Sequence, residues 1–279
     1  MRPYGRNAQW ALQRAGIAAH CFVIPPGETS KSFQLAQEIY EWLVGLKAER
    51  GQPIIAIGGG VSGDLGGFIA STFLRGVPFV QVPTSMAAMV DASIGGKVAV
   101  NLPQAKNMVG AFYQPRAVLA DVGALSTLGK RELAEGWAEA IKHGLILDPS
   151  TSAKTLGIRI LLNYGHTIGH ALEASTEYGR FMHGEGVSVG MMGAARIARE
   201  MGMIGDDIVE RQRTLLQRFN LPITAPDVDL AAVRSAMSLD KKTVGGANRW
   251  VLLEDVGQAT VRRDIPTELV DDTLAWLTR

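Results

Sequence analysis

The stretch Pro53–Asp64, with the sequence PIIAIGGGVSGD, decides the fold class of this chain. Its opening residues, Pro53 to Ile57, are apolar without interruption, which is typical of a short buried strand. Glycines follow at once, and helical periodicity runs from Asp64 to Phe73. A buried strand that passes through a glycine turn into a helix predicts an α/β fold.

The glycine turn itself carries a nucleotide-binding pattern. Gly58, Gly60 and Gly63 satisfy G-x-G-x-x-G, and the N–H groups that open the next helix would hold a pyrophosphate. The acidic residue expected about 20 residues further on is absent, because Pro83-Thr84-Ser85 occupies that region. The pattern therefore favours a nucleotide-binding turn in a related α/β fold over a plain Rossmann domain.

The strand–helix pattern extends outward from this stretch. We expect strands at 20–24 and 79–82 and a helix at 32–47, an alternation that predicts parallel pairing. Beyond a boundary near Leu128-Gly129 the pattern becomes helical. The expected helices there are 130–147, 162–175, 186–201, 206–219 and 230–237, and a small hairpin is expected from strands at 250–253 and 258–261.

Length and composition set further bounds. A chain of 279 residues is long enough for an α/β domain at 1–128 and a mostly α-helical domain at 129–279, with a ligand in the cleft between them. The net charge of +1 gives no global attraction to nucleic acid or a membrane surface. No apolar run is long enough to span a bilayer. The single cysteine, Cys21, excludes an internal disulfide and fits a cytoplasmic enzyme.

Histidines gather in the helical half of the chain. His166 and His170 are four residues apart and would share one helical face, with His183 downstream and Glu139 upstream. Two imidazoles and a carboxylate that leave one coordination position open make a catalytic zinc site. The alternative is a pair of helical histidines hydrogen-bonded in a core. His183-Gly184-Glu185 and the flanking glycines favour the metal.

Lysines and amides accompany glycine-rich turns. Gly95-Gly96-Lys97 and Lys106-Asn107 lie in polar, turn-rich sequence, where glycines beside a lysine can form an anion-binding concavity. Lys142 follows the candidate glutamate by three residues, and Arg159 could bind a carboxylate or phosphate with both arms of its guanidinium. Each lysine alone would be a solvated surface residue. Together these residues predict a site for a phosphorylated, acidic small molecule.

In combination, these motifs resemble those of the 3-dehydroquinate synthase family. The resemblance runs from Pro25 to Leu253, most of the chain. The matching motifs are Pro25–Lys31, Gly58–Asp64, Arg75–Phe79, Gln81–Thr84, Asp91 with Gly95-Gly96-Lys97, Lys106-Asn107, Glu139 with Lys142, Arg159 with Asn163–His170, and His183-Gly184-Glu185.

The resemblance implies a role for each matching residue. Glu139, His166 and His183 would bind a divalent metal, zinc or cobalt, and His170 would lie beside the metal without binding it. In the first domain, NAD would lie along Glu28, Lys31, Gly59, Gly60, Asp64, Thr84, Ser85 and Thr127. The substrate would contact Asp91, Lys97, Lys106, Asn107, Lys142, Arg159, Asn163, His170, Lys241 and Lys242, and among these Lys97, Lys142, Arg159, Asn163 and His170 would be catalytic.

The resemblance also implies a reaction. The family converts 3-deoxy-arabino-heptulosonate 7-phosphate to 3-dehydroquinate and phosphate, the second step of the shikimate route to aromatic amino acids. A hydride passes to NAD before phosphate is eliminated and returns afterwards, so NAD is recycled. A cytoplasmic homodimer is expected on the same ground.

Three other functions are weighed against this one. Another sugar-phosphate cyclase would make an inosose or a valiolone, and Arg159 together with Asn163 favours the dehydroquinate enzyme. A metal-dependent polyol dehydrogenase would release NADH, and the phosphate-directed lysines oppose it. An inactive scaffold protein would not need the metal ligands. The chain departs from the family before Pro25, where members carry a further strand-rich segment, and between Asp148 and Gly157, where they carry a longer helical stretch.

Overall fold

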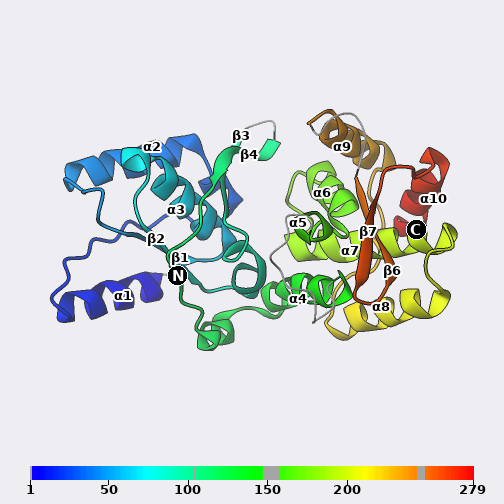
Figure 1. Cartoon of the computed structure of the whole chain (residues 1–279), viewed down its shortest axis with the longest axis horizontal. Helices are drawn as coiled ribbons and strands as arrows, with labels where there is room; N and C mark the ends of the chain where they lie inside the picture. Colours follow the sequence, from blue (N-terminus) through cyan, green and yellow to red (C-terminus); the bar gives the residue numbers. More distant parts are fainter. Residues whose placement is uncertain (1, 103–104, 147–157, 244–248) are drawn as a thin grey trace. The chain divides into compact units, whose positions relative to one another are not determined.

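A computed structural model describes residues 2–102, 105–146, 158–243 and 249–279. The chain divides into two compact units, Met1–Gly129 and Lys130–Arg279 (Figure 1). The first unit contains a parallel sheet with helices and the second is mainly helical, so the predicted fold class is confirmed. Among the described residues, no helix is both long and apolar enough to cross a membrane.

Three parallel strands form the sheet of the first unit, in the order β1-β2-β5. β1 (Ile54–Gly58) pairs with β2 (Phe79–Pro83), which pairs with β5 (Ala117–Val118). Burial alternates along β2, and Ile55 on β1 is exposed. The strand predicted at 53–57 is therefore present but buries one face only.

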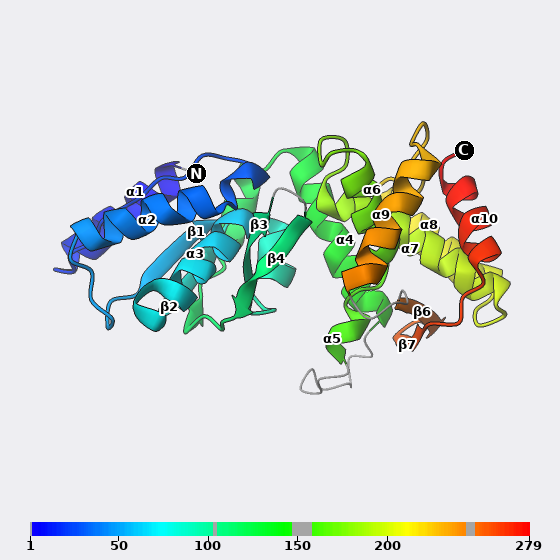
Figure 2. The same cartoon turned by 90° about the horizontal axis from the view of Figure 1, so that it is seen from above.

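The core of this unit forms between the sheet and two helices. α3 (Gly60–Thr72) packs on the sheet, and α2 (Phe33–Gly45) packs on α3 (Figure 2). Gly66 permits the close approach of α3 to β1, since a Cβ there would lie 2.6 Å from the Ala56 Cβ. The other helical segments are α1 (Arg2–Arg14), η1 (Glu28–Ser30), η2 (Phe73–Arg75), η3 (Ala88–Ala92) and η4 (Val122–Thr127).

An antiparallel hairpin that the sequence analysis missed lies against α3. β3 (Lys97–Leu102) pairs with β4 (Ala105–Phe112), with a register shift between Val100 and Leu102. The region looked turn-rich because its glycines and polar residues surround a short apolar face, Val98 and Val100, that enters the core. The strand expected at 20–24 is wrong: within the described chain this segment pairs with no strand.

In the second unit, helices are arranged around α7 (His183–Glu200), which contacts α4, α6, α8, α10 and β6 (Figure 1). The remaining elements are α4 (Lys130–Ile146), α5 (Ile158–Leu161), α6 (His166–Ser175), α8 (Asp206–Arg218), α9 (Leu230–Thr243), the hairpin β6 (Trp250–Asp255) and β7 (Gln258–Arg262), and α10 (Thr267–Leu277). All five predicted helices and the predicted hairpin are confirmed.

Close packing of α6 on α7 sets the position of the histidines. A Cβ at Gly190 would lie 1.9 Å from the carbonyl oxygen of Gly165, and one at Gly169 would lie 2.9 Å from Gly186. The two helices therefore touch backbone to backbone at both places. Gly165 also has φ +78, a conformation that glycine adopts without strain, and it starts α6 at His166 instead of the predicted 162.

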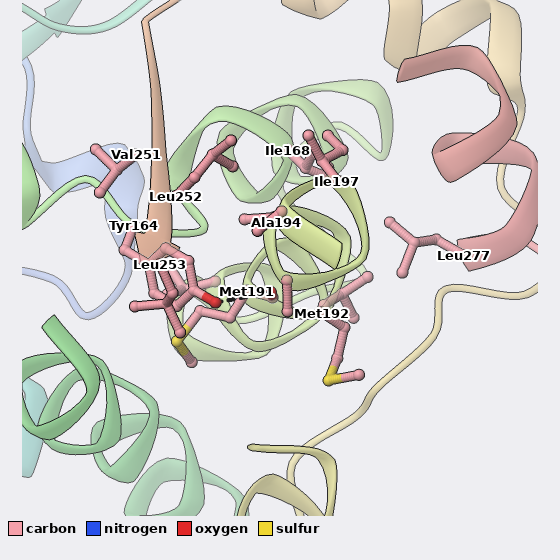
Figure 3. Packing of buried hydrophobic residues seen from close by; sticks show 14 of the residues in the cluster. Tyr164, Ile168, Met191, Met192, Ala194, Ile197, Val251, Leu252, Leu253 and Leu277 are labelled. Atoms are coloured by element: carbon pink, nitrogen blue, oxygen red, sulfur yellow. Dashed lines mark hydrogen bonds between the residues drawn. The ribbon is translucent and has the colours of Figure 1, made fainter. Parts of the chain in front are cut away.

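The apolar side chains around this crossing complete the core. Figure 3 shows Tyr164 and Leu253 close to Met191 of α7, with Ile168, Ile197 and Leu277 also in the cluster. The buried Tyr164 hydroxyl lies 2.7 Å from Gln212 Oε1 and 3.4 Å from the Met191 carbonyl oxygen. The core thus reaches directly behind the first turn of α6, where His166 lies.

Candidate active site

Glu139 occupies the centre of a buried polar cluster in the second unit. It lies on α4, is 1% exposed, and its Oε2 accepts a hydrogen bond from Nζ of Lys142, which is equally buried. Its Oε1 has no hydrogen-bond partner among the described residues. A buried carboxylate oxygen without a partner has lost its hydration without replacement. This atom is therefore the point at which a cation would be stabilised.

His166 directs one ring nitrogen at that oxygen. Its Nδ1 lies 3.1 Å from the Tyr164 carbonyl oxygen, and because a carbonyl only accepts, Nδ1 carries the proton. Its Nε2 lies 3.6 Å from Glu139 Oε1. Burial, assisted by the charge of Lys142, lowers the pKa of His166 well below its usual value. Two acceptor atoms therefore face each other, an arrangement that a cation between them would stabilise.

His183 approaches the same oxygen from the start of α7. Its Nε2 is also 3.6 Å from Glu139 Oε1, and its Nδ1 lies 2.8 Å from Glu173 Oε1 on α6. Burial lowers the pKa of His183, but the hydrogen bond and charge of Glu173 outweigh it and raise the pKa to about 9. A metal would have to displace the proton from Nε2, as metal binding to imidazole requires. A carboxylate behind a ligating histidine is a common orienting partner.

These three side chains fit a divalent metal by geometry and by charge. Two ligand atoms that are each about 2.1 Å from a tetrahedral zinc lie about 3.4 Å apart, close to the two 3.6 Å separations seen here. His170 extends the cluster: one ligand atom from each of His166, His170 and His183 lies within 4.8 Å of the others. His170 is exposed, so it borders the cluster on the solvent side.

A polar clamp holds the start of α7 against α4. Arg131 Nε and Nη2 each lie 2.7 Å from a different carboxylate oxygen of Glu185, and Glu185 also accepts a hydrogen bond from the Met182 N–H. Gly184 is required at this contact, since a Cβ there would lie 1.9 Å from the Glu135 carbonyl oxygen. The clamp thus fixes the helix start that carries His183 relative to the helix that carries Glu139.

The first unit places the predicted cofactor residues around two strand ends. Gly59 caps α3 and Gly60 begins it, and the Thr84 N–H donates to the Gly58 carbonyl oxygen at 2.8 Å. A Cβ at Gly59 would lie 3.3 Å from Ser85 Oγ, so the turn and the segment after β2 are close neighbours. The carboxyl ends of adjacent parallel strands, followed by a helix N-terminus, suit a pyrophosphate.

Lys31 joins several of the other predicted residues. It is 4% exposed, and its Nζ donates to Asp64 Oδ2 at 2.6 Å and to Asn107 Oδ1 at 2.5 Å. Glu28 Oε1 lies 3.7 Å from the same ammonium group. Burial raises the pKa of Asp64 although Lys31 opposes the shift. One hydrogen-bond network therefore joins Glu28, Lys31 and Asp64, which are predicted to contact NAD, to Asn107, which is predicted to contact the substrate.

The structure also describes several of the remaining predicted residues. In the first unit Asp91 and Lys106 are half-buried and Lys97 is exposed, and Thr127 donates to the Ala124 carbonyl oxygen. In the second unit the side chain of Asn163 is exposed beside α6. The side chains of Arg159, Lys241 and Lys242 lie outside the described residues, as does the segment 149–157, where the sequence departs from the family.

Sequence reasoning missed the residues that support the site. Glu173 lies seven residues after His166, two helical turns along α6, so helical periodicity would have placed it on the same face. Arg131 lies 54 residues from Glu185 and Asn101 lies 73 from Glu28. No local spacing signals such distant pairs.

The chain was compared with protein families and curated relatives. It matches the family description "3-dehydroquinate synthase N-terminal" over residues 21–135 and "3-dehydroquinate synthase C-terminal" over residues 150–243. A 3-dehydroquinate synthase from Nitrosospira multiformis is 43% identical, covering 94% of this chain and 82% of the relative. One from Streptococcus pneumoniae serotype 4 is 41% identical, covering 92% and 82%. The first alignment spans 299 residues, so it includes positions that this 279-residue chain lacks.

Solved structures give the same architecture. A 2-deoxy-scyllo-inosose synthase complexed with carbaglucose-6-phosphate, NAD+ and Co2+ has a TM-score of 0.84 and 27% identity, covering 96% of this chain and 86% of its own. A 2-epi-5-epi-valiolone synthase from Streptomyces hygroscopicus with NAD+ and Zn2+ has a TM-score of 0.88 at 24% identity, covering 99% and 87%, and supports the fold alone. Since both family descriptions and the curated relatives match over most of the sequence, the chain belongs to the 3-dehydroquinate synthase family.

Proposed function

We propose that this chain converts 3-deoxy-arabino-heptulosonate 7-phosphate to 3-dehydroquinate and phosphate, with NAD recycled in each turnover. The observation that carries the proposal is Glu139 Oε1, a buried acceptor without a hydrogen bond that faces one ring nitrogen from each of two histidines. Membership of the family supplies the chemistry for which such a centre is used.

The metal ligands would be Glu139, His166 and His183, with zinc or cobalt as the metal. The Co2+ of the related 2-deoxy-scyllo-inosose synthase supports a divalent metal at this site. Lys142 donates to Oε2 of Glu139, which leaves Oε1 for the metal. When bound, the metal and NAD supply a Lewis acid and a reversible hydride acceptor. His170 lies at the exposed side of the cluster and, as the family resemblance implies, would contact the substrate and not the metal.

NAD would be held by the first unit, through the turn Gly58–Asp64 and the residues around it. Gly60→Val tests this assignment sharply. A Cβ at Gly60 would meet only Ala92, at 3.8 Å, so the protein itself has room for it. We expect the variant to fold normally and to lose most of its NAD affinity, because the side chain would enter the space where the pyrophosphate approaches. Unchanged NAD affinity would remove this turn from the cofactor site.

Three of the proposed substrate residues of the first unit share one hairpin. Lys97 begins β3, and Lys106 and Asn107 lie on β4, so two ammonium groups and an amide would serve one anionic substrate. Asp91, Lys142, Arg159, Asn163 and one of Lys241 or Lys242 would complete the set, with Arg159 gripping a carboxylate or phosphate. In this proposal residues 1–128 form the NAD domain and 129–279 the metal and substrate domain. A homodimer is proposed on family resemblance alone.

An end-product assay tests the function. The purified chain is incubated with the heptulosonate 7-phosphate, catalytic NAD and zinc, and a chelator-treated sample serves as control. We expect equal amounts of phosphate and 3-dehydroquinate with no accumulation of NADH. Net NADH in proportion to product would instead indicate a polyol dehydrogenase. Absence of phosphate release from the heptulosonate, with release from a hexose 6-phosphate, would indicate a cyclase of the inosose type.

A further inference from the structure

Asn101, near the end of β3, uses its backbone N–H and both ends of its side chain in hydrogen bonds. Its backbone N–H donates to the Lys31 carbonyl oxygen at 2.7 Å, and its Nδ2 donates to Glu28 Oε1 at 2.8 Å. Its Oδ1 accepts from the backbone N–H of Asn107 at 2.9 Å. One asparagine therefore ties the turn at Glu28–Lys31 to both strands of the hairpin.

The bond to Asn107 falls at an unusual backbone position. Asn107 has φ +58, the left-handed conformation that non-glycine residues seldom adopt and that asparagine tolerates better than most. The adjoining hairpin register is also irregular between Val100 and Leu102. The Asn101 side chain accepts the N–H of this residue, so it supports the conformation that sets the direction of the Asn107 side chain.

The Asn107 side chain closes the connection. Its Oδ1 accepts from the buried Nζ of Lys31, which also donates to Asp64. The path from Lys31 to Asn101, then to Asn107 and back to Lys31, is a closed ring of hydrogen bonds, with Glu28 and Asp64 attached to it. A network in which each member is satisfied rigidifies its elements more than separate contacts would.

We propose that Asn101 is a positioning residue that fixes the hairpin carrying Lys97, Lys106 and Asn107 onto the turn carrying Glu28 and Lys31. The inference rests on the proposed function, in which the hairpin serves the substrate and the turn serves NAD. A role for Asn101 as a positioning residue explains how the first unit holds the proposed substrate residues and the proposed NAD residues in a fixed arrangement. Asn101 itself contacts neither ligand in this account; it acts through Asn107 and Lys31.

The chemistry at this position is specific to asparagine. Nδ2 must donate to a carboxylate while Oδ1 accepts an N–H, and only an amide of this length supplies both. Asn101→Leu removes both bonds and keeps the branched shape of the side chain. Asn101→Asp keeps the acceptor for Asn107 but places a second carboxylate beside Glu28. The two variants therefore separate support of Asn107 from attachment to the turn.

Two measurements test the proposal. Amide hydrogen exchange of residues 105–112 is followed in the protein without ligands, and KM and kcat for the heptulosonate phosphate are measured at saturating NAD. We expect Asn101→Leu to speed exchange in this strand about tenfold and to raise KM about tenfold, with kcat changed less than threefold. Asn101→Asp should show a smaller change in exchange. Met108→Ala, on the same strand and exposed, should behave as wild type.

The outcomes separate this inference from the proposed function. Wild-type exchange in residues 105–112 of both Asn101 variants would overturn the positioning role whatever the activity. Faster exchange with an unchanged KM would likewise overturn it, because the hairpin would then not serve the substrate through Asn101. A wild-type protein without activity, but with faster exchange in Asn101→Leu, would reject the proposed function and leave the ring in place as a structural device.

Discussion

Each unit contains a buried lysine paired with a carboxylate, and the two pairs differ in what surrounds them. Lys31 is paired with Asp64, and an amide, Asn107, takes a second bond from the same ammonium. Lys142 is paired with Glu139, but one oxygen of that carboxylate is left without a hydrogen bond and is faced by His166 and His183.

This difference indicates that one pair supports the structure and the other belongs to a metal-binding site. In the Lys31 network the ammonium group already supplies the positive charge between the Asp64 carboxylate and the Asn107 amide oxygen, so this network holds elements together and leaves no place for a metal. The Glu139 centre instead contains a buried carboxylate oxygen without a hydrogen bond, and such an atom is destabilised until a cation compensates it. The two regions therefore predict opposite responses to metal: large in the second unit and absent in the first.

Removal of one metal ligand gives the largest expected effect. His166→Ala should abolish metal binding and activity together, because the Glu139 carboxylate and one imidazole leave too few ligands for a stable site. Metal content by elemental analysis and phosphate release are measured on the same preparation. Stoichiometric, tight zinc binding by this variant would contradict the contrast between the two units, because the Glu139 cluster would then not be the metal site.

Helix packing comes second, because it places the two histidines. Gly190→Ala puts a Cβ 1.9 Å from the Gly165 carbonyl oxygen, and we expect a loss of about 3 kcal/mol in the free energy of unfolding. Gly144→Ala is the matched control: its Cβ meets nothing within 4 Å, and the substitution should stabilise the helix by up to about 1 kcal/mol. Chemical denaturation measures both, and equal effects would show that α6 and α7 do not require backbone contact.

The orienting carboxylate comes third. Glu173→Gln removes the charge behind His183 Nδ1, and loss of such a partner weakens metal affinity by about 10-fold to 100-fold. Zinc titration against a competing chelator gives the affinity, with Glu177→Gln, an exposed residue on the same segment, as the control. Wild-type affinity in Glu173→Gln would mean that His183 needs no orienting charge.

The smallest expected effect concerns a residue whose side chain lies outside the described part of the structure. Arg159→Lys keeps the charge but loses the planar fork that grips an anion. We expect kcat/KM to fall at least about tenfold, a loss of roughly 1.4 kcal/mol in transition-state stabilisation, with normal metal and NAD content. Near-wild-type kinetics would contradict the assigned role, and with it the argument against other sugar-phosphate cyclases.

Local sequence patterns predicted the helices and strands that depend mainly on neighbouring residues. Each helix of 130–237 follows from an apolar face at helical spacing, and β1 with its glycine turn follows from a short apolar run. The strand expected at 20–24 failed because a strand requires a partner, which a local pattern does not reveal. The hairpin β3–β4 was missed for the opposite reason: its pairing is strong, but only Val98 and Val100 signal it.

In the candidate site too, local sequence patterns predicted some residues and missed those that depend on distant contacts. Spacing alone would have paired His166 with His170, and the structure keeps a ligand atom of His170 within 4.8 Å of those of His166 and His183. His166 and His183 also each lie 3.6 Å from the Glu139 oxygen left without a hydrogen bond. The proposed ligand set of Glu139, His166 and His183 came from family resemblance, because the three residues lie on three different helices and no local spacing connects them. Neither local spacing nor family resemblance identified Glu173 and Asn101. Folding brings their hydrogen-bonding partners close, and nothing in the residue type indicates those partners in the sequence.

The most direct test of the account compares hydrogen exchange of the protein with and without zinc. We predict that zinc slows amide exchange in α4, α6 and the first turns of α7, where Glu139, His166 and His183 lie, and leaves residues 28–31 and 97–112 unchanged. Zinc-dependent protection of the Lys31 network, or none in the three helices, would contradict the claim that the metal completes the Glu139 centre and that the other network is complete by itself.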